Sequence, residues 1–97
     1  MPDYRLSRAA ESDLLDIARY TVRRFGVTQA EAYRDDLAQC FTLIAKHPQM
    51  GRERNAIRLG LRRHDHKGHA IYYIETDAGV VIVRILHKRQ DPTRHLG

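Results

Sequence analysis

The stretch of sequence that decides the fold is residues 57–86, IRLGLRRHDHKGHAIYYIETDAGVVIVRIL. Its hydrophobic period begins at two, because Ile57, Leu59 and Leu61 alternate with arginine and glycine. Such alternation puts apolar side chains on one face of a strand and polar ones on the other. We therefore predict a half-buried strand over residues 57–62.

Two more strands are expected in the same stretch. Residues 69–75 are rich in aromatic and β-branched side chains, which favours a second strand. Residues 80–86 are apolar except for one arginine, as expected of a central strand covered on both faces. Turn-forming residues fill 66–68 and 76–79, so we predict that the three strands form an antiparallel meander.

A short strand and a helix are expected at the start of the chain. Residues 3–6 alternate like a strand, and Ser7 suits the N-cap of a helix over residues 8–25. Apolar positions in that helix recur at steps of three and four, and Gly26 ends it. The apolar stripe consists of Leu14, Ile17, Ala18, Thr21 and Phe25.

A second amphipathic helix is expected to follow after a very short link. Thr28 and Glu31 have the spacing of a capping box, which predicts the start of the helix. Pro48 requires its end close to His47. The link is so short that the two helices should form an antiparallel hairpin. Its apolar positions are Tyr33, Leu37, Cys40, Phe41 and Ile44.

The predicted fold class is therefore α+β. The helical hairpin is expected to cover one face of the meander and bury its apolar stripes there, with the N-terminal strand joining one edge of the sheet. A chain of 97 residues has the size of one domain, so residues 1–97 are predicted to form a single domain. Residues 88–97 are polar and are predicted to be a loosely ordered tail.

Composition and charge limit the classes of function. The chain has no apolar run near the roughly 20 residues of a membrane span. Its first five residues have no apolar stretch behind a basic start, so no secretory signal is expected and the cytoplasm is the expected location. Cys40 is the only cysteine, which fits a reducing compartment. Its side chain is expected to be a small core residue.

The net charge is +5, and the excess lies in the second half of the chain. Residues 1–46 hold seven cations and seven anions, whereas residues 47–97 hold ten cations and five anions. Arginine supplies 14 of the 17 cations, and its planar fork suits phosphate and carboxylate partners. The charge indicates a nucleic acid or an acidic peptide as partner, or a solvated basic face.

Short motifs occur in order along nearly the whole chain. They are Tyr4-Arg5-Leu6-Ser7 with Ala10, Asp13-Leu14 and Ile17; Pro48-x-x-Gly51-Arg52; Gly60-Leu61-Arg62; His69-x-Ile71-x-Tyr73; and Arg84-Ile85-Leu86-His87-x-x-Gln90-Asp91. Together they resemble the ParE toxins, a family of the RelE/ParE superfamily of type II toxin–antitoxin systems. The resemblance implies the RelE-like fold, neutralisation by an acidic ParD-like antitoxin that folds on binding in a hetero-oligomer, and poisoning of DNA gyrase, which blocks replication.

Two alternatives stay open beside this function. Superfamily relatives of the RelE kind are ribosome-dependent endoribonucleases that cut mRNA. A non-toxic homologue would act with its antitoxin as a transcriptional repressor. No glycine-rich phosphate loop is present, and no cofactor is expected.

Arg84, His87 and Arg89 are the candidates for contact with the target, and in a ribonuclease they would be the catalytic cations and proton carrier. Arg84 is predicted to lie on the strand face of Val80, Ile82 and Leu86. No tyrosine follows Tyr73, so a nuclease site would lack the aromatic or further acid–base residue that nuclease relatives carry near the C-terminus. This absence favours a protein that is not an enzyme.

Two other groups of residues are candidates for binding sites. His64-x-His66-x-x-His69 has imidazoles on one strand face, but no second cysteine or placed carboxylate completes a zinc site, so solvated turn histidines are the favoured interpretation and no metal is expected. The antitoxin is expected in a groove at the edge of the hairpin and on the sheet face opposite the helices. The candidate contacts are Tyr20, Tyr33, Arg62 and Tyr72.

Overall fold

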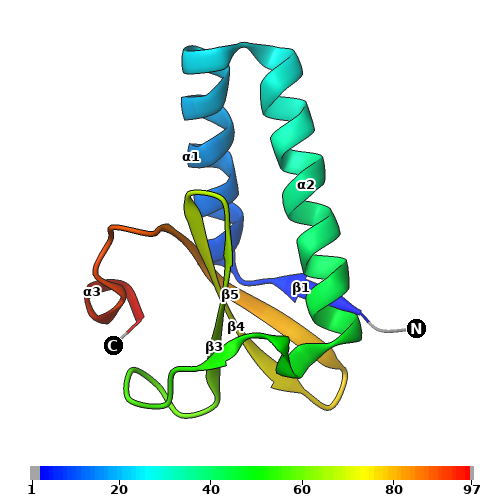
Figure 1. The fold of residues 1–97 in the computed structure, drawn as a ribbon, viewed down its shortest axis with the longest axis vertical. Coiled ribbons are helices and arrows are strands. Elements are labelled where there is room, and N and C mark those ends of the chain that lie inside the picture. The colour runs from blue at the N-terminus through cyan, green and yellow to red at the C-terminus, as the bar shows by residue number, and fades with distance from the viewer. Residues whose placement is uncertain (1–2, 97) are drawn as a thin grey trace.

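The computed structural model describes residues 3–96, so Met1, Pro2 and Gly97, which the single-domain prediction includes, lie outside the described part. Figure 1 shows a helical hairpin above one twisted sheet, with a short third helix beside the sheet at the left. In chain order the elements are β1 (Tyr4–Leu6), α1 (Arg8–Phe25), α2 (Val27–Lys46), η1 (Pro48–Met50), β2 (Arg52–Glu53), β3 (Leu61–His66), β4 (His69–Thr76), β5 (Gly79–His87) and α3 (Pro92–Leu96). The predicted α+β class and strand–helix–helix–sheet order are confirmed.

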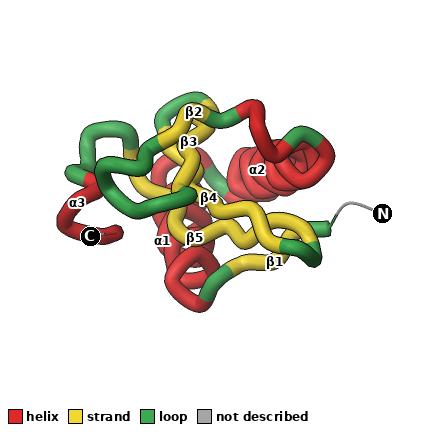
Figure 2. The backbone as a smooth tube through the Cα atoms, turned by 90° about the horizontal axis from the view of Figure 1, so that it is seen from below, coloured by secondary structure: helices red, strands yellow, loops and turns green. Residues whose placement is uncertain are grey.

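The strands form one sheet in the order β1-β5-β4-β3-β2. The pairs β3–β4 and β4–β5 are antiparallel, which confirms the meander. β1 lies parallel to β5 at the edge, with Tyr4 opposite Val80 and Leu6 opposite Ile82. Figure 2 shows the hairpin covering one face of this sheet.

Gly26 is the single residue between α1 and α2. Its φ of +93° is readily reached only by glycine, and it is both the last cap of α1 and the first cap of α2. The predicted N-cap of α1 is confirmed, because the Ser7 hydroxyl accepts the N–H of Ala10 at 3.0 Å. The predicted capping box of the second helix is wrong. α2 begins at Val27, so Thr28 already lies inside the helix and no side chain caps it.

The hairpin buries its apolar stripe on the sheet, as predicted. Leu37, Phe41 and Ile44 are buried against residues of β4 and β5, and Leu14 and Ile17 pack beside them. The stripe of α1 stops short of its end, because Phe25 is 64% exposed. The hairpin extends past the sheet (Figure 1), so the sheet does not cover its far end.

The first strand of the meander is shifted from its predicted position. β3 spans Leu61–His66, whereas most of the predicted strand over residues 57–62 is a turn. The Asn55 side chain accepts the N–H of Gly60, and Gly60 has a φ of +83°. That closed loop leaves Leu59 87% exposed, so the alternation of leucines does not reflect a buried strand face.

A β-bulge in β5 overturns the predicted face of Arg84. Tyr72 pairs with Arg84 while its neighbour Tyr73 pairs with Ile82, so one extra residue, Val83, lies between them. The extra residue reverses the alternation. Val80 and Ile82 face the helical hairpin, whereas Arg84 shares the opposite face with Leu86 and Tyr72.

The end of the chain is more ordered than predicted. Instead of a loose tail, Pro92–Leu96 forms α3, and Leu96 is only 8% exposed in a second apolar cluster with Tyr72 and Leu86. Its start is fixed by Asp91, whose carboxylate accepts the N–H and hydroxyl of Thr93. Within residues 3–96 no helix has the length and apolar character to cross a membrane.

Candidate functional site

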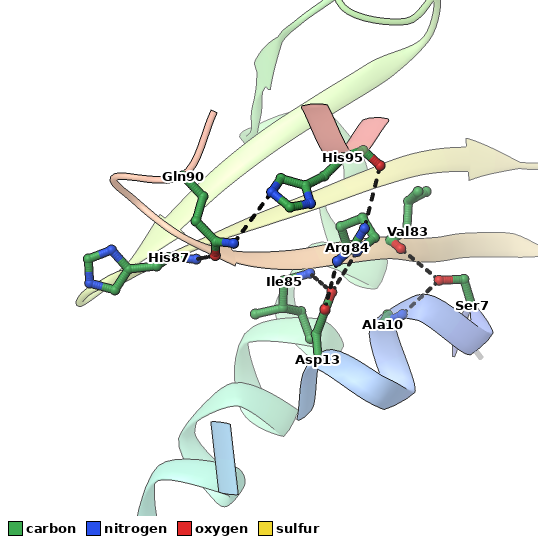
Figure 3. A network of polar contacts seen from close by, with 9 residues as sticks. All are labelled: Ser7, Ala10, Asp13, Val83, Arg84, Ile85, His87, Gln90 and His95. Carbon is green, nitrogen blue, oxygen red and sulfur yellow. Dashed lines mark hydrogen bonds and ion pairs between the residues drawn. The ribbon is translucent and has the colours of Figure 1, made fainter. Parts of the chain in front are cut away.

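Side chains cover the edge of β5 where β1 stops (Figure 3). The Ser7 hydroxyl donates to the carbonyl of Val83 at 2.6 Å, and the Asp13 carboxylate accepts the N–H of Ile85 at 2.9 Å. Further along, the Gln90 side chain accepts the N–H of His87 at 2.7 Å. These contacts satisfy backbone groups that an open edge would offer to another strand.

Arg84 is held inside this network. Its Nε and Nη2 donate to the two oxygens of Asp13 at 2.8 and 2.9 Å, and Nη1 lies 3.4 Å from the carbonyl of His95 (Figure 3). The side chains of the pair are 21% and 12% exposed. The hydrogen bond to Asp13 also raises the pKa of Arg84 above its ordinary value. The guanidinium therefore joins β5 to α1 and α3 and is not presented on an open surface.

Of the three residues expected to act together, Arg84 is separated from His87 and Arg89. His87 lies at the end of β5, exposed, and borders the groove on the helical side of the sheet. Arg89 is exposed in the turn that follows, and its N–H donates to Nδ1 of His87 at 3.2 Å. Arg84 lies on the opposite sheet face, so the structure does not bring its guanidinium to the His87 imidazole.

Tyr73 fastens the connection from α2 to the sheet. Its hydroxyl donates to the carbonyl of Pro48 at 2.7 Å and accepts the N–H of Gly51 at 2.8 Å. A Cβ at Gly51 would collide with the Tyr73 hydroxyl and ring. Arg62 donates to the carbonyl of Gly51 at 2.7 Å and lies 3.4 Å from Glu53. Arg62 is thus part of this junction.

A groove of about 450 Å³ lies between the far half of the hairpin and the turn joining β3 to β4. One wall is apolar and belongs to the helices, and the other end is formed by the β3–β4 turn and the end of β5. Its lining consists of Asp16, Ile17, Tyr20, Thr21, Phe25, Gln29, Tyr33, Lys67, Gly68, His69 and His87. Tyr20 and Phe25 are 59% and 64% exposed, so this part of the hairpin is left open.

Only two of the four predicted antitoxin contacts lie in the groove. Tyr20 and Tyr33 both line it. Tyr72 is 1% exposed beneath α3, and Arg63 donates to its hydroxyl at 3.1 Å, so it offers no contact surface. Arg62 is tied to the Gly51 junction. Burial of Tyr72 follows from the unpredicted third helix, which covers the sheet face that the sequence left open.

Three histidines form a row across the sheet at the end of the groove. His66 pairs with His69 across β3 and β4, and His69 pairs with His87 across β4 and β5. The rings of His69 and His87 lie 6.0 Å apart, edge to face. We call these residues the histidine row.

Tyr33 of α2 covers the histidine row. Its hydroxyl lies 2.6 Å from Nδ1 of His69, and its ring stacks on His66 at 5.9 Å. Burial is the largest cause that raises the pKa of Tyr33 to about 12. Burial is likewise the largest cause that lowers the pKa values of His66 and His69. The charge of Lys67 lowers the pKa of His66 further, and the neighbouring imidazoles of His87 and His66 lower that of His69. These imidazoles are therefore kept neutral at neutral pH.

Sequence reasoning missed Asp13, the histidine row and α3. No local pattern links Asp13 to Arg84, because their contact spans 71 positions. His87 was never grouped with His66 and His69, because only the pairing of β4 with β5 makes them neighbours. For α3 a signal was present, since Asp91-Pro92 is an N-cap followed by the favoured first helical residue. Among residues 3–96 no group of three or more histidine, cysteine or acidic side chains has metal-binding geometry.

Comparison with known proteins gives consistent results. Residues 4–92 match the family described as ParE toxin of type II toxin-antitoxin system, parDE. The chain is 40% identical to Toxin ParE1 of Caulobacter vibrioides over 97 residues, which cover 100% of both chains. It is 38% identical to Toxin ParE1 of Mycobacterium tuberculosis over 94 residues, 96% of each. A solved structure, the chromosomal ParDE TA system from P. aeruginosa, matches with a TM-score of 0.76 and 19% identity, covering 90% of this chain and 96% of that one.

Proposed function

Since the chain belongs to the ParE toxins of type II toxin–antitoxin systems, we propose that an acidic ParD-like antitoxin holds it inactive and that the free toxin poisons DNA gyrase. The match over residues 4–92, with relatives at 38–40% identity over almost the whole length, carries this proposal. Antitoxin binding and the gyrase target are the two parts that need separate tests.

The groove at the open end of the hairpin supports the antitoxin part. Tyr20 and Phe25 expose apolar surface at the groove, and the protein as a whole is basic. These two properties suit a partner segment that is both apolar and acidic. A segment that orders itself on binding gains by covering such surface. His87 borders the same groove, so an antitoxin seated there would also cover a residue proposed to contact the target.

The position of Arg84 supports a poison that is not an enzyme. A nuclease needs a cation beside the group that carries the proton, close to the scissile phosphate. Here the Arg84 guanidinium donates two hydrogen bonds to Asp13, and His87 lies on the other face of the sheet. In this proposal His87 and Arg89 contact the target directly, and Arg84 acts by holding α1 on the sheet.

Supercoiling by purified gyrase tests the target. The free toxin should inhibit supercoiling and accumulate cleaved DNA, and addition of the antitoxin should restore the activity. Arg89→Gln should weaken inhibition, whereas Arg23→Gln, which changes another exposed arginine on the outer part of α1, should not. Full supercoiling at saturating toxin would refute the gyrase target.

Primer extension on translated mRNA after a pulse of toxin expression tests the runner-up. Cuts that appear only during translation would establish a ribosome-dependent ribonuclease instead. If the folded chain gives a negative result in both assays and cells expressing it continue to grow, the remaining role is that of a repressor that acts with its antitoxin.

A further inference from the structure

The end of the groove holds an unusual concentration of imidazoles. His66, His69 and His87 come from three adjacent strands and lie side by side because each pair shares a register position. His69 and His87 both line the groove. Histidine is the side chain whose charge ordinarily changes near neutral pH, so this end of the groove can change charge where the rest of it cannot.

Apart from His64, the other titratable groups around the histidine row have fixed charges in that range. From the β3–β4 turn, Lys67 donates to Asp36 of α2 at 2.9 Å and lies 5.5 Å from the centre of the Tyr33 ring. The positive charge of Lys67 and the negative charge of Asp36 therefore compensate each other. The remaining groups are His64 on β3, Tyr33 and Cys40 on α2, and Asp16 on α1. Asp16 lies 3.8 Å from Arg19, so it too has a cation nearby.

We propose that the antitoxin segment entering this groove places a carboxylate against the histidine row, and that its binding takes up a proton, so that the complex tightens as pH falls. The inference rests on the proposed antitoxin binding and adds the chemistry of the contact. The occupant is an amphipathic helical segment whose apolar side chains lie along Ile17, Tyr20 and Phe25.

Charge and dimensions support that occupant. Ile17 and Phe25 are eight positions apart on the helical wall, which corresponds to about 12 Å of helix and fits two to three turns of a partner helix. Asp16 repels an anion at the helical wall, so the carboxylate is favoured at the histidine end. The chain carries a net +5, which also favours an acidic partner.

The sign of the pH dependence follows from the two states of the groove. In the free toxin, burial is the largest cause that lowers the pKa values of His66 and His69 below the ordinary histidine value, so both are mainly neutral at pH 7. A carboxylate within a few ångströms stabilises the imidazolium and raises these values. Between the free and bound pKa values the complex holds more protons than its parts, so affinity rises as pH falls.

Calorimetric titration of the toxin with the ParD-like antitoxin encoded with it tests the proposal. The dissociation constant should fall by about three- to tenfold from about pH 8 to about pH 6. At pH 7 the heat should differ between phosphate and Tris buffers in proportion to an uptake of about half to one proton. Circular dichroism at each pH checks that both proteins stay folded.

Variants assign the proton to the histidine row. His87→Gln alters an exposed side chain and should reduce the pH dependence, and His69→Gln/His87→Gln, which removes both members of the row that line the groove, should nearly abolish it. His95→Gln, an exposed histidine on α3, should keep the full dependence. This inference is overturned if the antitoxin binds tightly with an affinity that does not change with pH. It is also overturned if the double variant shows the same pH dependence as the parent toxin. Both results would leave antitoxin binding intact. No binding at any pH would instead refute the proposed function.

Discussion

The carboxylate of Asp13 holds the guanidinium of Arg84 by hydrogen bonds of 2.8 and 2.9 Å and accepts the backbone N–H of Ile85 at 2.9 Å. One side chain on α1 therefore pairs with a cation and also accepts a backbone N–H at a strand edge that no neighbouring strand covers. The contact joins the first and the last of the short motifs, which lie near opposite ends of the sequence. Its first consequence is for stability.

Asp13→Ala should lower the free energy of unfolding by about 2–4 kcal/mol, because it leaves Arg84 and the N–H of Ile85 without their acceptor. Urea denaturation followed by circular dichroism measures the loss. Asp16→Ala is the matched control, since Asp16 is 72% exposed and lies 3.8 Å from Arg19. The control should cost less than about 0.5 kcal/mol. Equal losses in the two variants would contradict the role assigned to Asp13.

Tyr73→Phe should cost about 1–3 kcal/mol, because the carbonyl of Pro48 and the N–H of Gly51 both lose a buried partner. The same urea experiment applies. Tyr20→Phe removes a hydroxyl from a residue that is 59% exposed and should leave the unfolding midpoint unchanged. An unchanged midpoint for Tyr73→Phe would show that water replaces the lost hydroxyl.

Leu96→Ala should destabilise the chain by about 1–3 kcal/mol, because Leu96 covers Tyr72 and Leu86 in the second apolar cluster. Thermal unfolding should show a lower midpoint. Leu59→Ala deletes the same atoms from a residue that is 87% exposed, and its midpoint should match that of the parent protein. If both leucine variants unfold alike, α3 contributes nothing to the folded state.

Stability should fall as pH drops below about 6.5, the ordinary pKa of histidine. Burial lowers the pKa values of His66 and His69 in the folded chain, so the unfolded chain binds more protons in this window. Urea midpoints at about pH 7.5 and about pH 5.5 measure the effect, and His66→Gln/His69→Gln should flatten it. The pKa values of Asp36 and Asp65 are lowered from 3.8, so their contributions disappear only at more acid pH. A midpoint that rises on acidification would contradict this account.

Much of the fold is predictable because it depends on neighbours in sequence. The helical period, the Ser7 cap and the stop at Gly26 define α1, and Pro48 ends α2. The apolar β-branched run of β5 identifies a strand inside the sheet. Where local signals conflict, prediction fails. The leucine alternation before β3 suggested a strand, but the Asn55–Gly60 loop closes there, and the Asp91-Pro92 helix start was hidden by polar residues.

The sequence by itself determined the helical hairpin, the meander and the excess of arginine, since periodicity, caps and charge are properties of short segments. Only the tertiary structure decided that Arg84 meets Asp13, that His66, His69 and His87 form a row, and that Tyr72 is buried. The first two depend on strand register, and the single extra residue at the Val83 bulge moves Arg84 from one face of the sheet to the other. The burial of Tyr72 depends on the packing of α3 against the sheet. Register is fixed by the packing of whole elements against each other, and no short segment encodes it.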